Sequence, residues 1–234
     1  MRSEIFNEAN AEVTTAERWI RQSDRMVKVT LGADALAVKG AMVAYQGSVT
    51  FQHEGSGSVG KFLRRALTSE DTPLMRVAGQ GEVFFARRAQ HVFFIMLEGD
   101  GISINGTSLL AFDATLSWDV HRVQGAGMMA GGMFNTLIQG QGVVAITSDG
   151  PPMILDCSRQ PTFVDVDAAV AWSAGLQPQV VNSMNMRSML RGGSGEAFQY
   201  SFHGPGFVVV QPSEGQPMPA QPSGGGGLGG LLGG

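Results

Sequence analysis

Three Gly-x-Gly motifs, each leading into a run of apolar residues, constrain the fold of this chain more than any other feature. The motifs begin at Gly79, Gly140 and Gly193. A second apolar run follows each motif after about ten residues, and the motifs start roughly 55 to 60 residues apart, which is the period of a repeated supersecondary unit. We interpret each unit as a glycine turn, a strand, a second turn and a second strand. The sequence therefore predicts three hairpin repeats, at 77–97, 138–157 and 191–211.

The composition agrees with a turn-rich β protein. Glycine contributes 33 of the 234 residues, and charged residues make up only 15%, against about 25% in an average domain. Hydrophobic residues, at 43%, suffice for a large core. We expect an all-β fold, an antiparallel sandwich or prism built from the repeated hairpins, with one or two short helices. The candidate helices are 58–67, which has helical apolar spacing, and 165–172, which begins with possible N-cap aspartates.

The chain reads as one β domain with a flexible segment at each end. The β domain spans 24–214, and residues 1–23 form a polar N-terminal arm. The tail, 215–234, is rich in Pro, Gly and Leu, and its low complexity predicts disorder. Its three leucines are a candidate docking motif on a flexible tether: Leu228, Leu231 and Leu232. Within the domain, Asn105-Gly106 between apolar positions predicts a hairpin with a type I′ turn.

Charge and cysteine content restrict the partners and the compartment. The net charge is −4, and no Lys or Arg follows Arg191, which argues against binding to a nucleic-acid backbone. The single cysteine, Cys157, rules out an intrachain disulfide and favours a reducing compartment. The N-terminus has no apolar signal-peptide region, and no apolar run approaches the ~20 residues that span a bilayer. We therefore expect a cytoplasmic protein.

No pattern of residues predicts catalysis or a cofactor. Residues 55–62 resemble a phosphate-binding loop, but Phe62 follows the lysine where Ser or Thr must hold Mg²⁺. The four histidines lack the spacing of metal ligands, although a site assembled across strands stays open. We expect a protein that is not an enzyme and carries no cofactor. A candidate interface or ligand loop is the Met/Phe-rich stretch with Met128, Met129, Met133 and Phe134.

Several stretches taken together resemble the AIM24 family, formerly a domain of unknown function. They are 38–45, 109–113, 132–135, 169–173, 195–199 and 206–214. The resemblance covers roughly residues 24–214 and is closer to the bacterial branch than to the mitochondrial one. It implies a β fold like that of the tryptophan RNA-binding attenuator protein (TRAP-like) and a homotrimer. Mitochondrial relatives are associated with inner-membrane organisation, and the family offers no catalytic motif that could be carried over.

Three functions follow as hypotheses. The first is a non-enzymatic scaffold or binding module that acts as a homo-oligomer, with a protein partner that the sequence does not identify. The second is a protein that binds a membrane surface or a small ligand through the Met/Phe-rich loop. The third, an RNA-binding ring, rests on fold analogy alone and conflicts with the negative charge.

Overall fold

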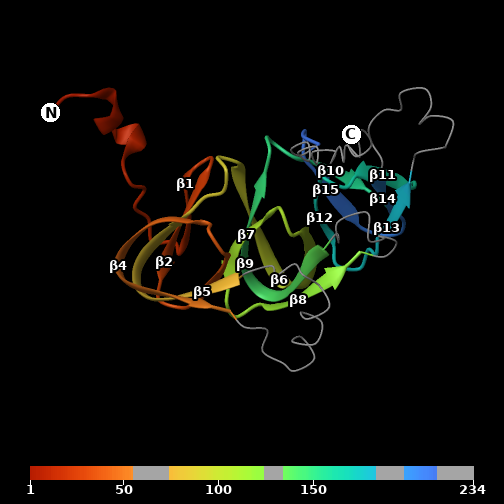
Figure 1. Ribbon diagram of the computed structural model, residues 1–234, viewed down its shortest axis with the longest axis horizontal. Helices are drawn as coiled ribbons and strands as arrows, with labels where there is room; N and C mark the ends of the chain where they lie inside the picture. Colours follow the sequence, from red (N-terminus) through yellow and green to blue (C-terminus); the bar gives the residue numbers. More distant parts are fainter. Residues whose placement is uncertain (55–73, 124–133, 183–197, 215–234) are drawn as a thin grey trace, which may run out of the picture.

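The computed structural model describes residues 1–54, 74–123, 134–182 and 198–214, and these form two antiparallel β-sheets (Figure 1). The first sheet has twelve strands and the second has three. The all-β, antiparallel prediction is confirmed. Helix is limited, among the described residues, to two 3-10 turns in the N-terminal arm, η1 (Glu4–Phe6) and η2 (Glu8–Asn10).

The large sheet begins within the predicted arm, because β1 pairs with β2. Its strands are β1 (Trp19–Ser23), β2 (Met26–Leu31), β3 (Ala35–Val38), β4 (Met42–His53), β5 (Leu74–Phe85), β6 (His91–Asn105), β7 (Leu109–Asp113), β8 (Ser117–Arg122), β9 (Phe134–Ser148), β10 (Met153–Asp156), β12 (Ala169–Ser173) and β15 (Phe207–Val210). The small sheet orders β11 (Thr162–Asp165), β14 (Phe198–Phe202) and β13 (Gln179–Asn182).

The large sheet folds over on itself around one core. Strands β1 and β6 are far apart in its hydrogen-bonded order, yet the rings of Trp19 and Phe94 meet edge to face at 6.3 Å. Buried side chains from β2, β3, β6 and β7, among them Val29, Leu36 and Ile104, belong to the same apolar cluster. A single sheet can bring these strands into one core only by bending sharply.

The bends lie at the first two Gly-x-Gly motifs, in the middle of long strands. Strand β5 pairs with β3 through 74–77 and with β2 through 81–85. Strand β9 likewise pairs with β8 through 134–139 and with β7 from 144 onward. Gly79, Gly140 and Gly142 lie between these two sets of partners, and Gly81 is the first residue of β5 that pairs with β2. Each strand therefore changes partner at its glycines. The third motif lies outside the described residues.

The predicted hairpin repeats are wrong in their pairing. Strands β5 and β6 follow one another across a short turn, but β5 pairs with β2, β3 and β4, while β6 pairs with β9 and β12. The backbone diverges at the turn: Ala86 N donates to Ala41 O, and Val92 N donates to Asp24 O. Strands β9 and β10, and β14 and β15, also pair with other strands. The sequence repeat therefore marks a recurring change of strand partner.

Two local predictions also differ from the structure. Asn105-Gly106 ends β6 without forming a hairpin, because β6 pairs with β9 and β12 while the next strand, β7, pairs with β3 and β9. The Asn105 side chain instead donates from Nδ2 to the carbonyls of Val166 and Ala169. Residues 165–172 form a turn and the start of β12 instead of a helix. The aspartate at 165 caps that turn, accepting a hydrogen bond from Asp167 N at 2.8 Å. The other predicted helix, 58–67, lies outside the described residues.

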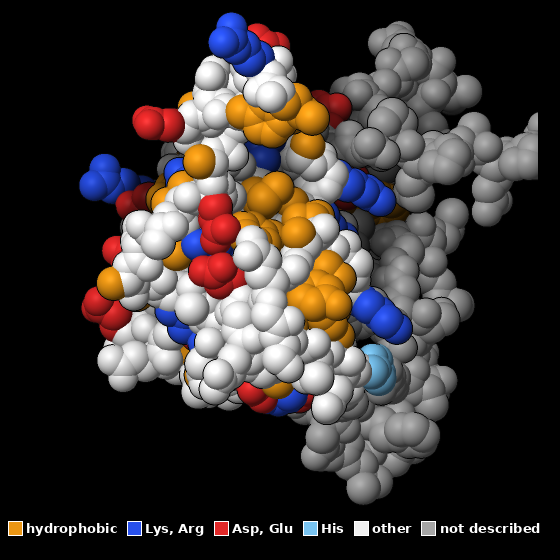
Figure 2. All heavy atoms as spheres, turned by 90° about the vertical axis from the view of Figure 1, so that its left-hand side faces the viewer, with side chains coloured by type: hydrophobic (Ala, Val, Ile, Leu, Met, Phe, Trp, Pro, Cys, Tyr) orange, Lys and Arg blue, Asp and Glu red, His pale blue; other side chains and the backbone are white. Residues whose placement is uncertain are grey.

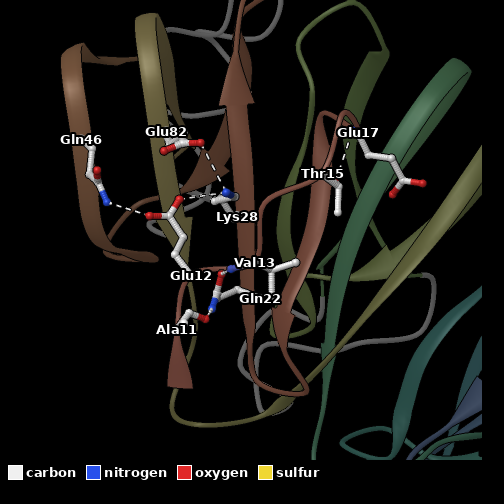
Figure 3. Close-up of polar contacts among 9 residues, drawn as sticks. All are labelled: Ala11, Glu12, Val13, Thr15, Glu17, Gln22, Lys28, Gln46 and Glu82. Atoms are coloured by element: carbon white, nitrogen blue, oxygen red, sulfur yellow. Dashed lines mark hydrogen bonds and ion pairs between the residues drawn. The ribbon is translucent and has the colours of Figure 1, made fainter. Parts of the chain in front are cut away.

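The N-terminal arm is fastened to the sheet by a buried lysine (Figure 3). Lys28 of β2 is only 1% exposed, and its Nζ donates to Glu12 Oε1 at 2.8 Å and to Glu82 Oε1 at 3.3 Å. Gln46 Nε2 donates to the second oxygen of Glu12 at 3.2 Å. Beyond this point the arm projects from the body (Figure 1). Glu12 therefore connects the arm with β2 and β4, and Lys28 extends this contact to Glu82 of β5.

Ionisation strengthens this contact at neutral pH. The hydrogen bond from Lys28 lowers the pKa of Glu12, while partial burial opposes that shift. Burial alone would lower the pKa of Lys28, but its hydrogen bonds to Glu12 and Glu82 outweigh it, so the pKa lies above its ordinary value. Because both groups stay charged across the neutral range, the lysine can be buried without an uncompensated charge.

Candidate functional site

The residues singled out in the sequence lie mostly outside the described part of the chain. This holds for Met128, Met129 and Met133, and for the three tail leucines, Leu228, Leu231 and Leu232. Phe134 is the first residue of β9, and its side chain is not described. The strands on either side of 124–133 are described, and they border a hollow in the surface.

The hollow lies over one face of four neighbouring strands. Trp172 of β12 is directly across from Ser103 of β6, and Ser103 is across from Leu137 of β9. Two residues before Leu137 on the same strand, Asn135 of β9 is across from His121 of β8. Directly opposite residues share a face of the sheet, as do residues two apart on a strand. The register of β12, β6, β9 and β8 therefore gathers these side chains on one side.

The loop after β12 completes the wall. The hollow has a volume of about 220 Å³. Its lining combines apolar side chains with a few polar ones: Ser103, His121, Val123, Asn135, Leu137, Trp172, Ala174, Leu176, Gln177 and Pro178.

Three polar side chains of the lining are buried and have no hydrogen-bond partner among the described residues. Ser103 is 4% exposed, Asn135 7% and Trp172 1%. Neither the hydroxyl, the carboxamide nor the indole N–H makes a hydrogen bond within the described ranges, and each borders the hollow. These three groups are not among the fully buried unpaired atoms of the described residues, which are Gln90 Oε1 and Thr136 Oγ1, so they face the open space of the hollow. The hollow therefore holds unused hydrogen-bonding capacity, which a bound molecule or water can fill.

His121 is the titratable residue of the lining. Its side chain is exposed, and Nε2 lies 3.7 Å from Asp119 Oδ2. None of the ten lining residues is Lys, Arg, Asp or Glu. Among the described residues, no group of three His, Cys, Asp or Glu side chains could hold a metal ion. The site thus offers neutral hydrogen-bonding groups and apolar contact surface.

A rigid aromatic cluster supports the Trp172 side of the hollow. The ring of Trp172 lies 5.7 Å from that of Tyr200 and 5.6 Å from that of Phe202. All three belong to the second core cluster, which joins the large sheet to β11 and β14 and also includes Val123 and Leu176. Burial, assisted by the charge of Asp167, raises the pKa of Tyr200 well above its ordinary value. This side of the wall is therefore part of the packed core.

The polar lining residues were not identified from the sequence. The sequence does indicate which residues of one strand share a face, because Asp119 and His121 are two positions apart on β8, as are Asn135 and Leu137 on β9. The lateral register that brings Ser103 and Trp172 beside them cannot be read from one sequence, because those strands are distant along the chain.

A second feature is an apolar strand at the edge of the large sheet. Strand β10 ends the sheet and pairs, within the described chain, with β15 alone. Met153 is 56% exposed and Ile154 is 69% exposed, and since they are successive strand residues they point to opposite faces. Phe207 of β15 is also exposed beside this edge, across from Asp156. Open apolar edges of this kind favour pairing with another chain.

The opposite end of the molecule also exposes apolar residues. Figure 2 views the end formed by the arm and the β4–β5 ribbon, and separate groups of hydrophobic side chains lie on it. Val43 and Tyr45 of β4 are about half exposed, and Ile5 and Phe6 of the arm are more so. Tyr45 packs its ring against that of Phe51 at 5.4 Å.

Comparisons with known proteins give a family and a fold. The family described as mitochondrial biogenesis AIM24 matches residues 19–213. The crystal structure of a Streptococcus pyogenes protein from a structural genomics project superposes with a TM-score of 0.66, at 20% identity, over 82% of this chain and 91% of that one. No curated protein matches the sequence. In the described part of the chain, no helix is long and apolar enough to cross a membrane. Because the family match runs from β1 to beyond β15, the chain belongs to the AIM24 family.

Proposed function

We propose that the protein is a non-enzymatic binding module that holds a small molecule in the hollow beside His121 and acts as a homo-oligomer. The observation that carries this proposal is the set of polar groups on Ser103, Asn135 and Trp172 that border the hollow and have no hydrogen-bond partner among the described residues. A protein gains nothing in stability from such groups, so their presence around an open hollow supports a binding role. The packed aromatic wall supports it further, since preformed sites lose less free energy on binding.

The homo-oligomer rests on the β10 edge. Met153, Ile154 and Phe207 leave apolar surface exposed on both faces of an unpaired strand edge. Pairing with a second copy would cover the surface and supply hydrogen-bond partners to the edge. We propose a trimer with a TRAP-like arrangement, as the family resemblance implies. Further partners would be proteins that bind the assembled oligomer. The net charge of −4 disfavours binding to nucleic acid.

A reducing, cytoplasmic compartment is part of the proposal. Cys157 is free and buried, and it is the one cysteine in the sequence. A protein of this size that uses no disulfide fits a compartment in which thiols stay reduced.

Native mass spectrometry of the protein purified gently from its own cells tests both parts at once. We expect a trimer that carries a copurified small molecule, released when the protein is denatured. A monomer at micromolar concentration would contradict the assembly. A trimer without bound molecule, which also fails to bind any member of a broad small-molecule panel, would contradict the binding module and leave a structural scaffold.

A further inference from the structure

The chemistry of the lining narrows the kind of molecule that the hollow can take. This inference rests on the proposed binding function and makes it more specific. The relevant groups are the carboxamide of Asn135, the hydroxyl of Ser103 and the indole N–H of Trp172, each of which borders the hollow without a partner among the described residues.

Size limits the part of a ligand that the hollow can enclose to about one ring. A cavity of about 150 Å³ holds benzene, whereas pockets for drug-sized molecules start near 300 Å³. At about 220 Å³, this hollow accommodates a ring with one small polar substituent. Leu137, Leu176 and Val123 provide apolar contact for the ring.

Charge excludes ionic ligands. Among the described lining residues there is no Lys, Arg, Asp or Glu, and the exposed His121 has Asp119 Oδ2 3.7 Å from its Nε2. A carboxylate or ammonium group bound next to Asn135 would lose its hydration without meeting an opposite charge, which is costly. The ligand must therefore be neutral where it meets Asn135.

The hydrogen-bond donors and acceptors of the lining determine which polar group the ligand must carry. Asn135 presents an acceptor oxygen beside a donor NH₂ group, and the Trp172 indole can only donate. A ligand group that satisfies Asn135 needs a donor next to an acceptor, and its acceptor can also serve the indole. A carboxamide or lactam has this arrangement, a carboxylate has no donor, and a hydrocarbon leaves all the groups unpaired.

We infer that the hollow binds a neutral ring that carries a carboxamide or lactam edge. The edge pairs with the Asn135 side chain, while the ring packs between Trp172 and the aliphatic residues of the wall.

The test is isothermal titration of the full-length protein with benzamide, benzoate and toluene as probes. Benzamide is expected to bind, and the other two to bind at least tenfold more weakly, because one lost hydrogen bond to a buried group changes affinity by about tenfold. Asn135→Leu should weaken benzamide binding by at least tenfold. Ser103→Ala is a milder change and should weaken it severalfold.

Asn135→Asp provides a readout that a purely structural role would not produce. The carboxylate accepts hydrogen bonds but cannot donate them, so the variant should lose benzamide and gain affinity for the benzamidine cation. The matched control is Ser117→Ala on β8. Ser117 is exposed, donates to Gln139 O at 3.2 Å and lies outside the lining, so that variant should bind benzamide like the unaltered protein.

The outcomes separate the ligand class from the proposed function. Benzamide binding that survives both Asn135→Leu and Ser103→Ala overturns the inference. Preferential binding of benzoate or toluene, reduced by Trp172→Phe, also overturns it but leaves a small-molecule binding module. If no probe binds and the native protein carries no small molecule, the inference and the proposed binding function both fail. Loss in Asn135→Leu or Ser103→Ala, together with the benzamidine switch, supports the inference.

Discussion

Gly81 of β5 lies directly across from Gly47 of β4, and neither position has room for a side chain. A Cβ atom on Gly81 would overlap the carbonyl oxygen of Gln46, and one on Gly47 would lie 2.6 Å from Gln80 O. Both residues also have positive φ, +139° and +93°. The two backbones can therefore approach at this bend only because both residues are glycine.

Gly81→Ala should destabilise the fold strongly. The left-handed backbone costs an alanine about 1–3 kcal/mol, and the overlap with Gln46 adds to this, so we expect a total loss of about 3 kcal/mol or more in unfolding free energy. Gly32→Ala is the control, because Gly32 has nothing within 4 Å of its Cβ position and no positive φ; it should change stability by less than about 1 kcal/mol. Urea unfolding measures both. Equal effects would refute the steric account of the motif.

Removal of the Asp113 carboxylate should lower the stability of the fold more than removal of an exposed carboxylate. Its Oδ1 accepts hydrogen bonds from Arg18 Nε at 3.1 Å and Trp19 Nε1 at 2.9 Å, and its Oδ2 accepts from Val143 N at 2.8 Å. Asp113→Ala removes all three, and we expect a loss of about 3 kcal/mol in thermal or urea unfolding. Asp156→Ala, at an exposed carboxylate, is the comparison and should cost less than about 1 kcal/mol. A small effect at 113 would mean that pairing with β2 and apolar packing hold β1 without the Asp113 carboxylate.

Acidification should release the N-terminal arm before the domain unfolds. The pKa of Glu12 is lowered in the folded state, so its contribution is present above the ordinary value of 4.5 and is lost as pH falls below it through the folded pKa. We expect cleavage within residues 1–18 by pepsin to accelerate at pH below about 4.5. Glu12→Gln should show rapid cleavage by a neutral protease already at pH 7.

The contact between Lys28 and Glu12 should also weaken at alkaline pH, where Lys28 loses its proton. The pKa of Lys28 is raised, so its contribution is complete below the ordinary value of 10.5 and declines as pH rises through the folded pKa. An arm that is as well protected in Glu12→Gln as in the unaltered protein at pH 7 would show that Glu12 and Lys28 do not hold it.

The β10 edge should control self-association. Ile154→Lys places a charge on the exposed edge strand and should convert the oligomer to monomer at micromolar concentration, measured by light scattering after size-exclusion chromatography. Val43→Lys makes the same exposed apolar-to-lysine change on β4 and should leave the mass unchanged. If Ile154→Lys retains the oligomer mass and Val43→Lys abolishes it, the interface lies at the other end of the molecule.

The sequence predicted the fold class but not the pairing of its strands. Apolar runs near Gly79 and Gly140 correctly indicated β structure, since alternation and glycine spacing are local properties. The proposed hairpins failed because a turn such as 86–90 can join strands that separate, and only the hydrogen bonds of Ala86 and Val92 reveal this. The hairpin predicted at Asn105-Gly106 was also wrong, and the Asn105 side chain donates hydrogen bonds to residues about sixty positions away. The hollow was missed because its lining comes together through lateral register.

The bent strands have a consequence for how the domain opens. Strands β5 and β9 each belong to two sets of partners on either side of their glycines, so neither half of the large sheet can separate without breaking a continuous strand. Amide hydrogens on both sides of the bends should therefore exchange with solvent at similar free energies, as one cooperative unit. The small sheet shares no strand with the large one, so only side-chain packing such as that of Trp172 on Tyr200 couples its exchange to that of the large sheet.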